Sequence, residues 1–194
     1  HTWRSYHYID PDTFNCHDSL LYSALEGYKV EFEKKIVPWK KGYFNPLLRA
    51  SVRQKNDRNI INKAIEANGN SLNMLMNRND VDMLNLYTRE DMLIIVKQAI
   101  ANNPIAVQAL FSLEGSKYAM TKQALRLYPN TLQQRELVMY VCSVPLRKYY
   151  RFPILEYFHK FGSDTEVVKA ALRHNPRNLI WVTEQVKKNN LDTI

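Results

Sequence analysis

Cys16, His17 and Asp18 are consecutive residues that could supply a nucleophile beside a general base. A thiolate needs its base to face it in space, and side chains at consecutive helix positions point in different directions. Asp18 also comes directly before the apolar run "SLLYSAL", where a carboxylate can cap a helix. We therefore interpret Asp18 as a cap and assign no catalysis to this triplet.

A metal site is the second kind of chemistry that the N-terminal residues could support. His7, Asp10, Asp12 and His17 carry suitable donor atoms, but their spacing matches no recognised zinc or calcium site. The chain has five glycines and contains neither a phosphate-binding glycine loop nor a G-x-S-x-G motif. We predict no catalytic residue, no metal and no cofactor, and the sequence indicates no small-molecule substrate.

Two clusters interleave basic and aromatic side chains, which suits binding. The first comprises Trp39, Lys40, Lys41, Arg49, Arg53 and Arg58, and the second Arg147, Lys148, Tyr149, Tyr150 and Arg151. Cations with flat rings can hold the phosphates and bases of single-stranded nucleic acid. Tyrosine, tryptophan and arginine also anchor protein–protein interfaces, and long basic side chains often cover a core with their charge in water. Protein contact, nucleic-acid contact and a plain solvated surface stay open as interpretations.

The net charge of +8 is concentrated in residues 29–63, where ten Lys and Arg outnumber three acids by seven. We predict a helix that begins at Pro46 after the cap Asn45. Arg49 and Arg53 are four residues apart on it and should share a face as a basic stripe. Such a local field attracts phosphate, anionic lipid or an acidic protein without choosing among them.

The elements that position these clusters are indicated by a pattern that occurs four times. The copies are "KAIEANGNSLNML" from Lys63, "QAIANNPIAVQAL" from Gln98, "QALRLYPNTLQQR" from Gln123 and "AALRHNPRNLIWV" from Ala170. Each has an alanine one turn before Asn or Tyr, followed by Pro or Gly. Proline ends one helix and suits the first turn of the next, and Gly69 can take the left-handed conformation that often ends a helix. The pattern predicts helix hairpins.

The last copy shows the expected hairpin in detail. Ser163 and Glu166 have the spacing of a capping box, and Asn175 should cap the helix that follows Pro176. The apolar stripe of that second helix would consist of Leu179, Ile180, Val182 and Val186.

We predict an all-α protein of helix-hairpin repeats, stacked as an irregular solenoid or bundle after an irregular N-terminal arm. The arm is residues 1–17, and residues 18–194 form a single helical domain with basic helices over 18–63 and hairpin repeats over 58–194. The alanines of successive copies, at 64, 99, 124 and 171, are 35, 25 and 47 residues apart, so the period is irregular.

The stretch "DTEVVKAALRHNPRNLIWV" resembles short tandem helical repeats of unknown function with the pattern D-x-x-V-V-x-A-A-x-x-N-G/P-x-x-L. These repeats occur in bacterial effector-type, phage and protist proteins. The matching residues are Asp164, Val167, Val168, Ala170, Ala171, Asn175, Pro176 and Leu179. The resemblance implies a helical-repeat fold and no particular chemistry.

We expect a non-enzymatic helical-repeat module that binds proteins, as a scaffold or a subunit of a larger assembly, because such arrays expose extended surfaces. The alternative is a nucleic-acid-associated basic protein that uses residues 39–63 on phosphates. No apolar run approaches the roughly 20 residues of a membrane span. The two cysteines make no disulfide framework, so we expect an intracellular, reducing compartment: the cytoplasm, or an organelle matrix if a targeting segment has been removed.

Overall fold

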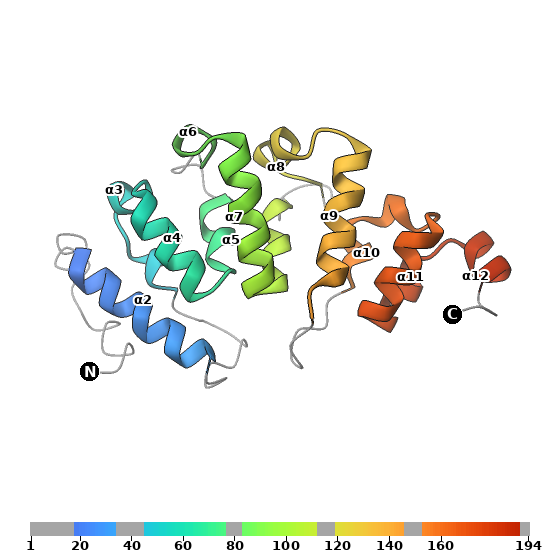
Figure 1. Cartoon of the computed structure of the whole chain (residues 1–194), viewed down its shortest axis with the longest axis horizontal. Coiled ribbons are helices and arrows are strands. Elements are labelled where there is room, and N and C mark those ends of the chain that lie inside the picture. Colours follow the sequence, from blue (N-terminus) through green and yellow to red (C-terminus); the bar gives the residue numbers. More distant parts are fainter. Residues whose placement is uncertain (1–17, 34–44, 77–82, 112–118, 146–152, 191–194) are drawn as a thin grey trace. The chain divides into compact units, whose positions relative to one another are not determined.

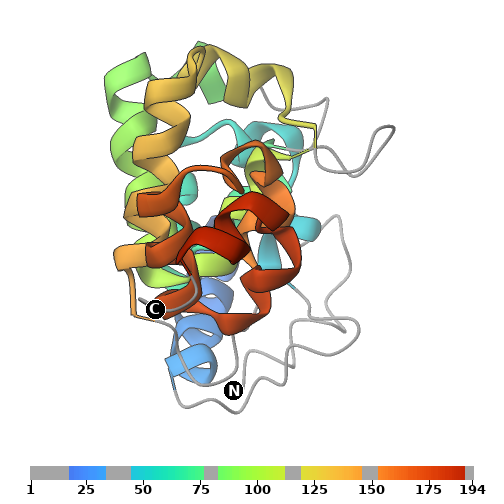
Figure 2. The ribbon, with the colours of Figure 1, turned by 90° about the vertical axis from the view of Figure 1, so that its right-hand side faces the viewer.

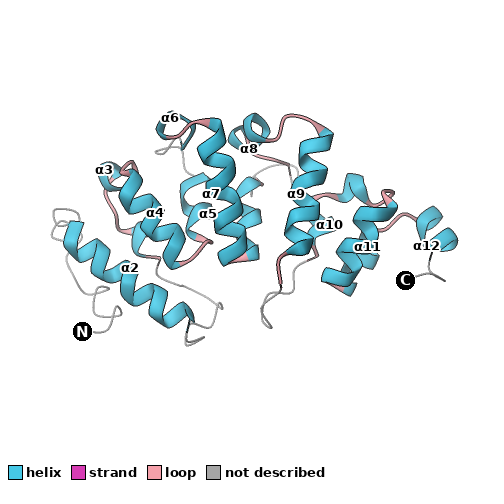
Figure 3. Ribbon diagram, in the orientation of Figure 1, coloured by secondary structure: helices cyan, strands magenta, loops and turns pink. Residues whose placement is uncertain are grey.

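The computed structural model describes residues 18–33, 45–76, 83–111, 119–145 and 153–190. Over these residues the chain is all-α, as the sequence predicts, and Figure 3 shows helices and loops there without a strand. An isolated antiparallel bridge joins Phe111 to Met120. The arm expected over residues 1–17 lies outside the described residues. The chain divides into two compact units, His1–Ala109 and Leu110–Ile194, and each is described on its own.

In unit 1, the long helices α2 (Asp18–Glu33), α4 (Arg58–Ala67) and α7 (Arg89–Asn102) lie side by side in that order (Figure 1). The shorter elements around them are η2 (Pro46–Leu48), α3 (Val52–Lys55), α5 (Ser71–Met76), α6 (Met83–Leu86) and η3 (Pro104–Leu110). α4 contacts both α2 and α7, so it is the central helix of this unit.

Unit 2 is built around α9 and α11, which pack against each other (Figures 1 and 2). Its elements are α8 (Lys122–Leu127), α9 (Thr131–Ser143), α10 (Ile154–Tyr157), η4 (His159–Phe161), α11 (Thr165–His174), η5 (Pro176–Trp181) and α12 (Glu184–Asn190). α10 contacts α9, η4 and η5, and its Ile154 and Leu155 are fully buried in the core of this unit.

The long helices of both units bury their residues in one common register. Positions i, i+1 and i+4 are buried, which on a helix of 3.6 residues per turn makes one narrow stripe toward the core. The buried triplets are Ile60, Ile61 and Ala64; Ile95, Val96 and Ala99; Leu137, Val138 and Val141; and Val167, Val168 and Ala171. The sequence predicted the third copy at Ala124, on α8. A hairpin does turn at Tyr128, but α9 is the helix with the shared register.

Asn68, Asn103 and Asn175 end α4, α7 and α11 in the same way. Each has an extended backbone, and its N–H donates to the carbonyl of the alanine four residues before it. Each side-chain Oδ1 accepts a hydrogen bond from the N–H two residues further on, at 3.0 to 3.2 Å. The predicted helix ends at these positions are therefore confirmed, and the asparagine starts the next turn as well as stopping the helix.

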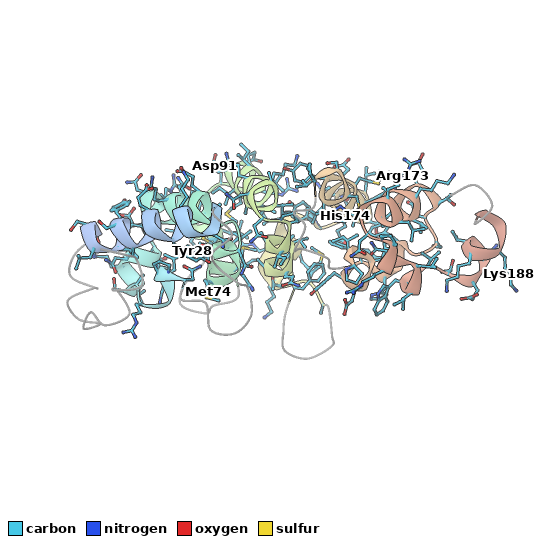
Figure 4. All side chains as sticks on the ribbon, turned by 90° about the horizontal axis from the view of Figure 1, so that it is seen from below. Tyr28, Met74, Asp91, Arg173, His174 and Lys188 are labelled. Carbon is cyan, nitrogen blue, oxygen red and sulfur yellow. The ribbon has the colours of Figure 1, made fainter. Side chains whose placement is uncertain are left out.

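In unit 1, these cap asparagines also bond to one another. Asn103 Nδ2 donates to Asn68 Oδ1 at 2.9 Å, and Asn68 Nδ2 donates to the hydroxyl of Tyr28 at 2.8 Å. All three side chains are buried, and Figure 4 marks Tyr28 on α2. We call this the asparagine ladder. It links Tyr28 of α2 to the C-terminal ends of α4 and α7. Asn175 Nδ2, in contrast, is buried and has no hydrogen-bond partner among the residues that the structure describes.

Gly69 is required for a reason other than the expected left-handed turn. α4 already ends at the extended Asn68, and a Cβ on Gly69 would lie 1.9 Å from the carbonyl oxygen of Ala99 on α7. The Gly69 N–H donates to Asn102 Oδ1 at 2.8 Å. The glycine therefore lets the turn after α4 lie directly against the backbone of α7.

The last hairpin differs from the prediction on both sides of α11. The N-cap of α11 is Asp164, which accepts hydrogen bonds from Glu166 N and Val167 N, rather than Ser163. After the turn, Leu179 is 40% exposed and Ile180 is 76% exposed, so only part of the predicted apolar stripe, Val182 and Val186, is buried.

Asn178 takes the buried place in this segment because η5 is a 3₁₀ helix with three residues per turn. Its side chain is fully buried. Nδ2 donates to the carbonyl of Ala171 at 2.8 Å, and Oδ1 accepts from the N–H of Leu155 at 2.8 Å. An amide with partners on two sides joins α11, η5 and α10, which an aliphatic side chain could not do.

Candidate functional site

Most of the residues that the sequence nominates for binding lie outside the described part of the chain. They are Trp39, Lys40 and Lys41 in the segment 34–44, and Arg147, Lys148, Tyr149, Tyr150 and Arg151 in the segment 146–152. The structure describes Arg49, Arg53 and Arg58. The described residues that follow the second cluster form core, since Phe158 and Phe161 are buried.

The predicted basic stripe of Arg49 and Arg53 is wrong. Asn45 and Pro46 do begin a helix, with Asn45 Oδ1 accepting from Leu47 N, but this helix is η2 and it ends at Leu48. Ser51 then caps α3 in a capping box with Gln54. Because the chain turns between the two helices, Arg49 and Arg53 do not share one helix face.

Arg53 is engaged by Asp18 at the start of α2. Its Nη2 lies 2.7 Å from Asp18 Oδ1, and its Nη1 lies 3.3 Å from Oδ2. Gln54 Nε2 donates to the same carboxylate at 2.9 Å. The hydrogen bonds from Arg53 and then Gln54 lower the pKa of Asp18, so the carboxylate is ionised and ties α2 to α3.

Two pairs of neighbouring long helices are joined by ion pairs across their outer surface. Between α2 and α4, Lys29 pairs with Glu66 and Lys63 pairs with Glu26. These contacts raise the pKa of Lys63 and lower that of Glu66, and they use part of the positive charge of residues 29–63 within the fold.

The second bridged surface lies between α9 and α11. Arg135 Nε lies 2.8 Å from Asp164 Oδ2, and Nη2 of the same arginine contacts Glu166. The Arg135 guanidinium holds the pKa of Asp164 below its usual range. The Arg135 side chain thus covers the surface between these two helices, and its charge is paired with carboxylates.

Between α4 and α7 lies a surface groove of about 660 Å³, which we call the α4–α7 groove. Each helix contributes a row with one residue per turn, and a third set forms the floor and one end. The α4 row is Arg58, Asn62 and Glu66; the α7 row is Ile94, Gln98 and Asn102; the floor and end residues are Ile65, Tyr87, Ile95 and Asp91.

Arg58 and Tyr87 form one end of the α4–α7 groove. The Arg58 guanidinium carbon lies 4.9 Å from the centre of the Tyr87 ring. The Tyr87 hydroxyl donates to Arg58 O and Asn62 Oδ1, both at 3.2 Å. Burial raises the pKa of Tyr87 to about 12, so the hydroxyl stays a neutral donor. Asn62 Oδ1 accepts this hydrogen bond.

Arg58 has the helix position of Arg135, because each lies two residues before the first buried aliphatic residue, Ile60 and Leu137 respectively. Among the described residues, Arg135 binds two carboxylates, whereas Arg58 forms no ion pair. Where α11 has Glu166, one residue before its buried Val167, α7 has an isoleucine one residue before Ile95.

That isoleucine, Ile94, is 55% exposed. Asp91 lies one turn before it and is exposed (Figure 4), and it lines the groove without pairing with Arg58. The other end is closed by Asn102, whose Nδ2 donates to the Glu66 carbonyl at 3.0 Å. The α4–α7 groove therefore combines an arginine that forms no ion pair among the described residues, an exposed aliphatic side chain and side-chain amide groups.

Unit 2 has a smaller pocket of about 220 Å³ beside an aromatic cluster. The Phe111 ring lies 5.0 Å from those of Tyr157 and Phe158. Lys160 lies over the ring of Phe161 at 5.2 Å and bonds to Gln134. These side chains satisfy one another, so the pocket is a packing feature of the core.

Cys142 and His174 are the remaining titratable groups of interest. Burial raises the pKa of the Cys142 thiol to about 12, so it stays protonated and is a poor nucleophile. Burial also lowers the pKa of His174, although a hydrogen bond to the Cys142 backbone opposes this. In the described ranges no group of three or more His, Cys, Asp or Glu is placed to hold a metal ion.

No helix over the described residues is both long and apolar enough to cross a membrane. Comparison of the chain with models of known protein families, with curated proteins and with solved structures found no match.

Proposed function

We propose that this chain is a non-enzymatic helical-repeat module that binds another protein, as a scaffold or a subunit of a larger assembly. The observation that carries the proposal is the α4–α7 groove. The surfaces between α2 and α4 and between α9 and α11 are closed by the chain's own ion pairs. The α4–α7 groove instead presents Arg58 without a carboxylate and Ile94 at 55% exposure.

The groove's composition suits a protein partner. Arginine beside an aromatic ring and an exposed aliphatic side chain are the residue types that contribute most to protein–protein binding energy. The asparagine ladder and the Gly69 contact hold α4 and α7 in place, so binding would require little ordering of the module itself.

The nucleic-acid alternative depends on Lys40 and Lys41, which lie outside the described residues. In the described part of the same basic segment, Arg53, Lys29 and Lys63 contact carboxylates of this chain. The protein-binding proposal is therefore preferred.

The test is retention of proteins from a lysate by the immobilised chain of residues 1–194, at low and high salt, with and without nuclease. An Ile94→Glu variant places a charge in the groove at an exposed position. The matched control is Leu132→Glu on α9, where an aliphatic side chain is 63% exposed outside the groove. We expect a defined set of proteins to survive high salt and nuclease, to remain with the Leu132 variant and to be lost with the Ile94 variant. The proposal is contradicted if nuclease abolishes the retention of proteins, or if the Ile94→Glu variant retains the same proteins as the unchanged chain.

A further inference from the structure

We infer that the α4–α7 groove binds a short extended peptide segment of the partner, which brings a carboxylate to Arg58 and an aliphatic side chain to Ile94. This inference rests on the proposed function and specifies the kind of partner.

The equivalent arginine in unit 2, Arg135, indicates that Arg58 would bind a carboxylate. Arg135 binds Asp164 through Nε at 2.8 Å and also contacts Glu166. Arg58 has the same position on α4, but it forms no ion pair among the described residues, and Asp91 of α7 lines the groove without pairing with it. The Tyr87 ring beneath the guanidinium, 4.9 Å away, holds the side chain over the groove. A carboxylate from outside would complete the arrangement that Asp164 completes in unit 2, with the directional hydrogen bonds that arginine forms with carboxylates.

The aliphatic side chain is argued from the exposed apolar surface next to Arg58. Ile94 is 55% exposed, and beside it Ile65 and Ile95 reach the groove floor with 5% and 6% exposure. Covering this surface removes apolar area from water, which favours binding by roughly 25 cal/mol for each Å². A charged or small partner side chain would gain nothing at this position.

The length of the groove and its side-chain amides favour an extended conformation of the bound segment. Each row spans eight residues of helix, or about 12 Å at about 1.5 Å per residue. An extended chain rises about 3.3 Å per residue, so about four residues fill the groove and every second side chain faces one helical turn. Asn62 Nδ2 and the Gln98 amide lie in the middle of the rows. An extended backbone offers them free carbonyl and N–H groups, whereas a helix uses these groups internally.

The charge of Asp91 predicts the direction in which a substitution should change the affinity for an acidic segment. It lies at the same end of the groove as Arg58, and its charge contributes to the environment of the same tyrosine hydroxyl. An incoming carboxylate is attracted by Arg58 and opposed by Asp91. Replacing Asp91 by the neutral asparagine should therefore strengthen the binding of an acidic segment, while a basic segment should lose affinity.

The experiment uses fluorescence anisotropy with the chain of residues 1–194 and a labelled hexapeptide pool, Gly-Glu-X-Leu-X-Gly, in which Glu and Leu are two residues apart on one face. One control pool has Lys in place of Glu. The other, Gly-Glu-Leu-X-X-Gly, puts Glu and Leu on opposite faces of an extended chain. We expect saturable binding of the first pool only, at up to millimolar concentration.

The variants assign this binding to the groove. Arg58→Glu and Ile94→Ser should each weaken the Glu–Leu pool about tenfold, a loss of about 1.4 kcal/mol. Asp91→Asn should tighten binding of the Glu–Leu pool severalfold. The Arg58→Glu variant should bind the Lys pool, which the unchanged chain does not bind. Arg173→Glu, at an exposed arginine of unit 2 (Figure 4), is the matched charge control and should change nothing. Circular dichroism confirms that every variant is folded.

Three results overturn the inference: no saturable binding of the Glu–Leu pool, equal binding of the pools, or binding that Arg58→Glu leaves unchanged. If the pool fails while Ile94→Glu still abolishes protein retention, the partner binds the groove in another form and the proposed function stands. If both tests fail, the proposed function fails as well.

Discussion

The asparagine ladder makes a quantitative prediction about two asparagines that cap equivalent helices. Asn68→Ala removes three hydrogen bonds: from Asn70 N, from Asn103 Nδ2 and to the Tyr28 hydroxyl. It also leaves the buried Asn103 amide and Tyr28 hydroxyl without these partners. A buried polar group left unsatisfied costs about 1–3 kcal/mol, so the expected loss of unfolding free energy is about 3–5 kcal/mol.

Asn175→Ala is the matched variant, because Asn175 ends α11 with the same backbone geometry. It removes one hydrogen bond, from Arg177 N, together with a buried Nδ2 that has no partner among the described residues. Loss of a cap costs about 1 kcal/mol, and removal of an unsatisfied amide offsets part of it. We therefore expect a loss of about 1 kcal/mol or less.

Hydrogen exchange of backbone amides, read by mass spectrometry, separates the two units. Asn68→Ala should accelerate exchange over residues 57–76 about a hundredfold or more, since a factor of ten corresponds to about 1.4 kcal/mol. Asn175→Ala should accelerate exchange over 164–182 by tenfold at most. A Tyr28→Phe change should be strongly non-additive with Asn68→Ala. Equal effects of the two asparagine variants would refute the ladder as a source of stability.

Three further predictions concern single sites. Gly69→Ala should destabilise unit 1 strongly, because the alanine Cβ would lie 1.9 Å from a carbonyl oxygen of α7. The midpoint of thermal unfolding measures this destabilisation, and an unchanged midpoint would contradict the close approach. The pKa of Asp164 is lowered in the folded state, so its contribution to stability is present above its unfolded pKa and is lost as pH falls through the folded pKa. The urea midpoint of unit 2 should therefore fall as the pH is lowered, and it should fall less steeply in the Arg135→Gln variant. Parallel curves of urea midpoint against pH for the two proteins would contradict the pairing. With its pKa raised to about 12, the half-buried Cys142 thiol in a Cys16→Ser background should be alkylated at pH 8 more slowly in the native than in the unfolded chain, and equal rates would contradict the raised pKa.

The features that the sequence predicted correctly are those that neighbouring residues decide. Asn103 and Asn175 before proline end their helices where expected, because proline disfavours the helical conformation of the residue before it. Asn45 and Pro46 start a helix for a similarly local reason. The all-α class followed from the recurrence of such breaks between stretches of helical periodicity.

The features that the sequence missed depend on contacts between distant residues. Arg53 is bound by Asp18, 35 residues away in the sequence. The end of η2 and the capping box at Ser51, which also break the basic stripe, are a local signal that the sequence predictions did not use. Leu179 is exposed because Asn178 has hydrogen-bond partners on two other elements. Composition alone favoured the leucine for the core.

The α4–α7 groove was also absent from the sequence predictions, although one signal existed. The run "LIIV" places Ile94, Ile95 and Val96 together on α7, while the shared register buries only two adjacent positions. One of the three apolar side chains must therefore face outward. Recognising this required the register of the other helices, which the irregular spacing of the copies hid.

The amino-acid sequence by itself determined where the helices before Asn103–Pro104 and Asn175–Pro176 stop, that the fold is all-α and where positive charge is concentrated, since these follow from local backbone preferences and composition. Only the tertiary structure decided which charges are neutralised within the fold and which cap asparagines bond to one another. It also decided which helix surface stays open. The physical reason is that the partners in these ion pairs and hydrogen bonds are 29 to 40 residues apart in the sequence, and no local pattern records their proximity in space.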